Sequence, residues 1–151
     1  MPDKPSALRA LKHEIDERIS SLETALDNSR MEMANDTKST AGDKHETGRA
    51  MAQLEQEKLG KQVLAARELK QAIAQIDANK VHSEIQFGSL VEASNGHLFF
   101  SVGIGKLIIQ NEYEPVFCLT MTSPLGMALR GKKAGDAVEF NGRKISILSV
   151  E

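Results

Sequence analysis

Tryptophan is absent from this chain of 151 residues, and tyrosine and cysteine occur once each. The single cysteine, Cys118, cannot form an internal disulfide, so we expect a reducing compartment. No run of residues is long and apolar enough to span a bilayer, and the first residues lack the apolar core of a signal peptide. These absences favour a cytoplasmic protein with no membrane partner.

A strong charge of one sign is also lacking. Lysine and arginine number 19 and aspartate and glutamate number 21, which gives a formal net charge of -2. This balance gives no general reason to expect a nucleic-acid binder that is held by charge alone. The composition, with 26% charged and 40% hydrophobic residues, is typical of a folded soluble chain.

Motifs of the common enzyme classes are missing as well. The chain has no Walker-type phosphate loop, no paired-cysteine zinc signature and no nucleophile elbow. The glycine pair in Gly103–Gly105 is best interpreted as a bulge or bend in a strand. His13, His82 and His97 are scattered, so we expect solvated or locally bonded imidazoles. Cys118 lies in an apolar segment, which predicts a buried, inert thiol.

Two halves of different composition meet near Lys80. All the aromatic residues and most of the 11 glycines lie after it. In residues 1–79, apolar residues recur at steps of three or four, the spacing of amphipathic helices. The first stripe is Leu8, Leu11, Ile15, Ile19, Leu22, Leu26 and Met33, and the second is Met51, Leu54, Leu59, Val63, Ala66, Leu69, Ile73 and Ile76. Pro5 suits the first turn of the first helix, and the step from Leu54 to Leu59, next to Gly60, slips out of phase.

A polar break separates the two stripes, from Asn35 to Gly42, and its residues favour caps and turns. Two narrow stripes of similar length can bury their seams against each other. We therefore predict an antiparallel helical hairpin over residues 1–79, with its tip at about residues 36–46. The alternative is one continuous helix in an intermolecular coiled coil.

Residues 80–151 are predicted to form a small β-rich domain with one short helix, so the whole chain belongs to the α+β class. Alternating residues predict a strand from Leu98 to Ile104, and Val116–Thr120 is a second. Asn-Gly pairs at 95–96 and 141–142 predict hairpin turns. Ser123 can cap the short helix, whose first position suits Pro124 and which can end at Gly131.

Two acidic residues, Asp43 and Glu46, fall near the hairpin tip. They are three positions apart, so one face of an opening helical turn carries both carboxylates. Such a pair can share Mg²⁺, which prefers oxygen ligands. Spacing alone favours the simpler interpretation, in which acidic residues in a first turn cap the helix and complement its dipole.

The segment Gly42-Asp-Lys-His-Glu-Thr-Gly-Arg-Ala50 resembles the hairpin-tip motif of Gre-type bacterial transcription elongation factors, in which glutamate follows a Gly-Asp pair. Ser123-Pro-Leu-Gly-Met-Ala-Leu-Arg-Gly-Lys-Lys-Ala-Gly-Asp136 is similar to the C-terminal signature of the same family. The resemblance covers nearly the whole chain. It departs at Thr47-Gly-Arg49, where Asn-Ala-Glu is more typical, and over Leu98–Thr122, where the usual acidic segment is not apparent.

The resemblance implies an FKBP-like fold for residues 80–151 and a rod that enters the secondary channel of RNA polymerase. There its tip would stimulate cleavage of backtracked RNA at the nascent 3′ end by the polymerase itself. By position, Asp43 would help to hold an Mg²⁺ shared with the polymerase, and Glu46 would hold that metal or position the water. The protein would be a catalytic accessory and no enzyme on its own. It would bind no metal tightly when free, would contact nucleic acid only within the polymerase complex, and would be a monomer.

Three other functions remain open. A Gre-like regulator could occupy the secondary channel without promoting cleavage. A coiled-coil adaptor unrelated to transcription would dimerise through residues 5–79. A prolyl isomerase is a possibility on fold grounds, but the scarcity of aromatic residues argues against an aromatic-lined proline pocket.

Overall fold

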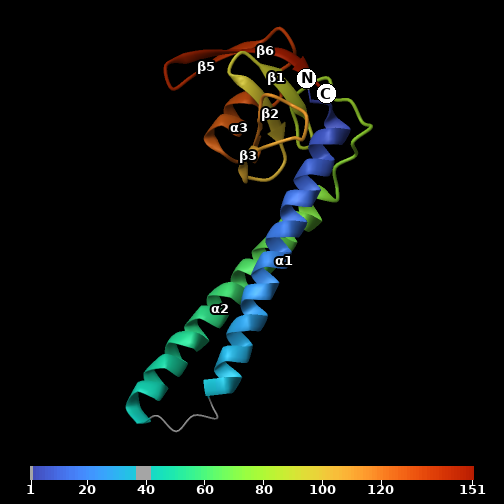
Figure 1. Ribbon diagram of the computed structural model, residues 1–151. Helices are drawn as coiled ribbons and strands as arrows, with labels where there is room; N and C mark the ends of the chain where they lie inside the picture. The colour runs from blue at the N-terminus through green and yellow to red at the C-terminus, as the bar shows by residue number, and fades with distance from the viewer. Residues whose placement is uncertain (1, 37–41) are drawn as a thin grey trace. The chain divides into compact units, whose positions relative to one another are not determined.

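The computed structural model describes the backbone of residues 2–36 and 42–151 and the side chains of residues 2–35 and 47–151. Two long helices come first, α1 (Lys4–Asp36) and α2 (Gly42–Ile73), and they run antiparallel (Figure 1). By contacts the chain divides into two compact units. The sheet unit comprises Met1–His13 with Gln71–Glu151, and the hairpin unit comprises Glu14–Lys70. The compositional boundary near residue 80 stays a prediction about domain organisation.

The start of α1 is fixed by a side-chain cap. Asp3 Oδ1 accepts a hydrogen bond from the Ser6 amide at 2.7 Å, and the Asp3 carbonyl accepts one from the Ala7 amide at 3.0 Å. The bonds from Ser6 hold the pKa of the Asp3 carboxyl below its usual value. Pro5 lies in the first turn, as predicted, where its missing N–H is of no consequence.

The apolar stripes are buried only in part. In the hairpin unit the seam contains Ile15, Leu59, Val63 and Ala66, all of them buried. Met51 and Leu54 were predicted to belong to the second stripe, but they are 67% and 66% exposed. Rotation about the helix axis is the reason, since at about 100° per residue Leu54 lies about 140° and Met51 about 80° away from Leu59. α2 itself runs unbroken through Gly60.

The sheet unit is built on six strands in the order β3-β4-β2-β1-β6-β5. Their bounds are β1 Leu90–Ala93, β2 Gly96–Phe100, β3 Gly105–Leu107, β4 Val116–Leu119, β5 Ala137–Phe140 and β6 Arg143–Val150. β2 and β4 pair in parallel, and every other neighbouring pair is antiparallel. The short helix α3 (Pro124–Leu129) adds Leu129 to the buried core, which the sheet supplies with Val91, Leu98, Phe100 and Ile147.

The predicted turns are confirmed with two corrections. Asn141 and Gly142 both have positive φ, 51° and 77°, and they join β5 to β6. In the first hairpin the turn lies one residue earlier than predicted, because Ala93 pairs with Gly96. The predicted strand from Leu98 to Ile104 is too long: β2 ends at Phe100, and the chain bends before β3 begins at Gly105, where φ is +77°.

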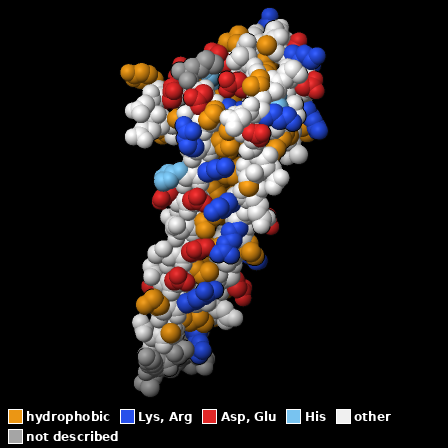
Figure 2. Space-filling view, turned by 90° about the vertical axis from the view of Figure 1, so that its right-hand side faces the viewer, with side chains coloured by type: hydrophobic (Ala, Val, Ile, Leu, Met, Phe, Trp, Pro, Cys, Tyr) orange, Lys and Arg blue, Asp and Glu red, His pale blue; other side chains and the backbone are white. Residues whose placement is uncertain are grey.

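The α+β prediction is therefore confirmed: a helical hairpin is followed by a mixed β-sheet with one short helix. None of the helices in the described parts of the chain combines the length and the apolarity needed to cross a bilayer. Figure 2 shows acidic, basic and hydrophobic side chains intermixed along the helices on the visible face, so this face carries no field of a single sign.

Candidate functional site

The predicted tip, at about residues 36–46, includes the end of α1 at Asp36 and the first residues of α2 from Gly42, and residues 37–41 between them lie outside the described residues. The backbone of Asp43 and Glu46 belongs to the opening turns of α2. The side chains of both residues lie outside the described residues, so their catalytic and metal-binding roles stay predictions.

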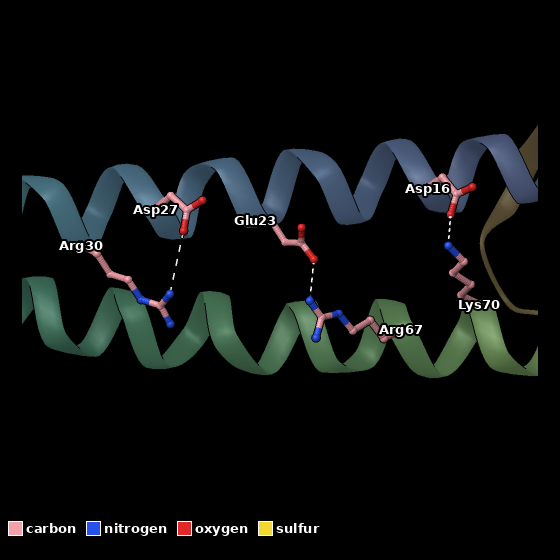
Figure 3. Close-up of polar contacts among 6 residues, drawn as sticks. All are labelled: Asp16, Glu23, Asp27, Arg30, Arg67 and Lys70. Atoms are coloured by element: carbon pink, nitrogen blue, oxygen red, sulfur yellow. Dashed lines mark hydrogen bonds and ion pairs between the residues drawn. The ribbon is translucent and has the colours of Figure 1, made fainter.

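Two ion pairs across the hairpin fix the register of the helices (Figure 3). Lys70 Nζ lies 2.9 Å from Asp16 Oδ1, and Arg67 Nη2 lies 2.6 Å from Glu23 Oε1. All four side chains are 42–60% exposed, so each pair contributes at most about 1 kcal/mol. Their value is geometric, since the later residue of α1, Glu23, pairs with the earlier residue of α2, Arg67, as an antiparallel hairpin requires.

The same pairing continues towards the tip. Gln56 Nε2 donates to Met33 Sδ at 3.0 Å, and Met33 is three residues before the end of α1. Arg30 Nη1 lies 3.9 Å from Asp27 Oδ1 on the same helix. The two helices therefore stay paired to within a turn of Asp36 on α1, and Gln56, the α2 member of this last contact, lies ten residues after Glu46.

Several positions of the second motif, Ser123–Asp136, have a role in local folding. Ser123 Oγ accepts from the Gly126 amide at 3.0 Å and donates to the Thr120 carbonyl at 2.7 Å. A Cβ at Gly126 would lie 2.1 Å from that carbonyl oxygen, so only glycine fits. Gly131 has a φ of +76° and donates to the Ile85 carbonyl at 2.9 Å. The motif therefore encodes the local fold around α3, and the chemistry must come from elsewhere.

His82 and Cys118 behave as predicted, the first as a locally bonded imidazole and the second as a buried thiol. His82 Nδ1 lies 2.7 Å from Ser89 Oγ, and burial, with the nearby charges of Lys4 and Lys80, lowers the pKa of the His82 imidazole. Burial raises the pKa of the Cys118 thiol to about 12, so it stays protonated and unreactive.

An open groove of about 870 Å³ lies on the sheet unit, and the sequence did not reveal it. Its lining includes Leu98, Pro115, the half-exposed Phe117 and Leu125, and also His97 and Glu114. His97 Nε2 is 3.3 Å from Glu114 Oε2. These residues come from β2, β4 and α3 and the loop before β4, so no local pattern could predict that they meet.

A buried lysine was also missed. Lys4, the first residue of α1, is only 2% exposed, and no periodic pattern distinguishes it from a solvated lysine. Among the residues whose side chains are described, no group of three or more histidine, cysteine, aspartate or glutamate residues could hold a metal ion. Asp43 and Glu46 are not among those residues.

No protein-family model matches the chain, and no curated protein matches it. Two solved structures are similar. The crystal structure of the GreA factor homolog 1 (Gfh1) protein of Thermus thermophilus is 18% identical, with 88% of this chain and 94% of that chain covered at a TM-score of 0.34. A structure of the transcription factor Gfh1 is 17% identical, with 88% and 92% covered at a TM-score of 0.33. Identities and TM-scores this low do not assign the chain to a family.

Proposed function

We propose that the protein is a Gre-like transcription factor that binds RNA polymerase, inserts its hairpin tip through the secondary channel and stimulates cleavage of backtracked RNA. The observation that carries this proposal is the position of the Gly42-Asp43 and Glu46 motif, which opens the second helix of a long intrachain hairpin. The Ser123–Asp136 signature supports it independently, in the expected order along the chain.

The chemistry suits paired carboxylates. Hydrolysis of a phosphodiester needs an activated water and stabilised charge on the phosphorane oxygens, which Mg²⁺ ions supply. Carboxylate oxygens are preferred donors for Mg²⁺, and Asp43 would help to hold an ion shared with the polymerase. Glu46, one helical turn further, would hold that ion or orient the attacking water. Two carboxylates alone leave most of an octahedral shell to water, so the free protein would bind Mg²⁺ weakly.

On this account the protein is an accessory to the polymerase and has no reaction of its own. The hairpin would act as a spacer: α1 has 33 residues, which corresponds to about 50 Å of helix. The exposed ion pairs of its surface are compatible with an aqueous channel, because charged side chains there remain hydrated.

The test is an RNA-cleavage assay on a backtracked polymerase complex with end-labelled RNA. We expect the parent protein to shorten the RNA, and Asp43→Asn and Glu46→Gln each to slow cleavage by about tenfold or more while polymerase binding is retained. Glu57→Gln is the matched control, since it neutralises an exposed carboxylate on the same helix. If both tip variants cleave as fast as the parent, the assigned chemistry is wrong.

A channel regulator that binds polymerase without promoting cleavage is the second candidate. The residues after Glu46 favour it: Thr47-Gly-Arg49 places a helix-weakening glycine and a cation where the family more typically has Asn-Ala-Glu. This candidate predicts tight binding of the parent protein to polymerase, no RNA shortening, and no change in either readout on substitution of Asp43 or Glu46.

A further inference from the structure

Lys4 is the most unusual charged residue in the described parts of the chain. Its side chain is 2% exposed, and lysine is almost never fully buried unless its ammonium group is paired. It is also the first residue of α1, where the positive end of the helix dipole disfavours a cation, and the Asp3 carboxylate at this end is bonded to the Ser6 amide. Both its burial and its place at the helix N-terminus disfavour the charged ammonium group, so interactions with its partners must offset this cost.

The partners of the ammonium group indicate that role. Lys4 Nζ donates to the Lys80 carbonyl oxygen at 2.6 Å and, at a longer 3.4 Å, to the Glu151 backbone oxygen. These partners are 76 and 147 positions away along the chain. One side chain therefore joins the start of the first helix, the connection after the second helix and the segment that follows β6.

Each of these segments is itself anchored within the sheet unit. Glu151 extends the sheet, since its amide and its backbone oxygen both bond to Leu90. Lys80 closes a turn by donating to the Asp77 carbonyl, just after the buried Ile76. Burial lowers the pKa of the Lys4 ammonium, while the charges of Glu151 and Asp77 act in the opposite direction and favour the charged form.

We propose that Lys4 is a positioning residue that pins the root of the hairpin, residues 4–13 of α1 and the turn after α2, to the sheet. α1 continues without a break from this root into the hairpin unit. Lys4, Lys80 and Glu151 all belong to the sheet unit, so the pin holds the first turns of α1 against the sheet within that unit. The role of this pin in RNA cleavage rests on the proposed function, because a tip that completes an active site must be held in position.

The experiment compares Lys4→Met, which keeps the length of the side chain but removes its donors, with the parent protein. Spin labels at Arg9→Cys and Lys144→Cys, both exposed positions, report the distance distribution between the root of α1 and the sheet within this unit; Cys118 is buried and escapes labelling. We expect Lys4→Met to broaden this distribution about twofold or more and Lys4→Arg, which keeps a cationic donor, to restore most of its sharpness. Lys12→Met, the same change at an exposed site of α1, should leave it unchanged.

A cleavage assay adds a readout that a merely structural role would not move. We expect Lys4→Met to lower the maximal cleavage rate at saturating protein by about tenfold, with little change in the concentration needed for half-maximal effect. If the Lys4→Met protein gives a distance distribution as narrow as that of the parent, the proposal is wrong. It is also wrong if Lys4→Met removes amide protection throughout the sheet. If the parent protein does not stimulate cleavage, the proposed function fails, while the distance measurement still decides the role of Lys4.

Discussion

The hairpin unit and the sheet unit are stabilised in different ways. The hairpin buries a thin seam, with Ile15, Leu59, Val63 and Ala66 as its buried hydrophobic residues in the described part, and links its helices by exposed ion pairs. The sheet unit has a contiguous core on one face of the sheet, closed by α3. In a thin seam each contact contributes little, so the loss of one side chain is tolerated. In a close-packed core the loss of one side chain destabilises the whole unit. The contrast predicts that similar substitutions will have unequal effects in the two units.

Truncation of a buried side chain should give the largest difference. Phe100 is fully buried in the core, so Phe100→Ala is expected to cost about 4 kcal/mol in the free energy of unfolding of the sheet unit. Leu59→Ala should cost the hairpin about 2 kcal/mol, because an open seam is filled more readily by water and neighbouring side chains. Native-state amide exchange resolves the two units separately. Equal losses would remove the distinction between core and seam.

Two glycine-to-alanine substitutions, one in each unit, test the same contrast. They are expected to change the free energy of unfolding in opposite directions. Gly126→Ala should destabilise the sheet unit by about 3 kcal/mol, because the new Cβ would meet the Thr120 carbonyl oxygen at 2.1 Å. Gly60→Ala should stabilise the hairpin by about 1 kcal/mol, because nothing lies within 4 Å of the new methyl and alanine favours the helix. Chemical denaturation monitored by amide exchange measures the free energy of unfolding for both variants. A stable Gly126→Ala protein would show that the turn before α3 can relax.

The smallest effect is expected at the surface of the hairpin. A double-mutant cycle with Glu23→Gln and Arg67→Met should give a coupling energy below about 1 kcal/mol, since both side chains are half-exposed. The coupling should fall further in high salt, where surface charges are screened. A coupling of several kcal/mol that persists in salt would mean that this pair stabilises the hairpin as strongly as its seam does.

Sequence patterns predicted the elements whose signals are local. The helical stripes, the cap at Ser123 and the turn at Asn141 and Gly142 depend on neighbouring residues, and the structure confirms them. The prediction for Met51 and Leu54 was wrong. A hydrophobic residue close in sequence to a stripe lies on its buried face only if the rotation of the helix also brings it there.

Features made by distant segments could not be predicted. The Lys4 pin joins residues more than seventy positions apart, and the groove beside Phe117 depends on the crossing from β2 to β4. No local spacing encodes either of them. The candidate site lies between these cases: the helical backbone at Asp43 and Glu46 follows from sequence, while their carboxylates lie outside the described side chains.

The central claim is that Asp43 and Glu46 complete the active site of another protein from the end of a hairpin. The most direct measurement is the cleavage rate of backtracked complexes as a function of Mg²⁺ concentration, with saturating parent protein, with the Asp43→Asn/Glu46→Gln double variant, and with neither. We predict that the parent lowers the Mg²⁺ concentration for half-maximal cleavage by about tenfold and that the double variant leaves it unchanged. The same Mg²⁺ dependence in all three reactions would contradict the account.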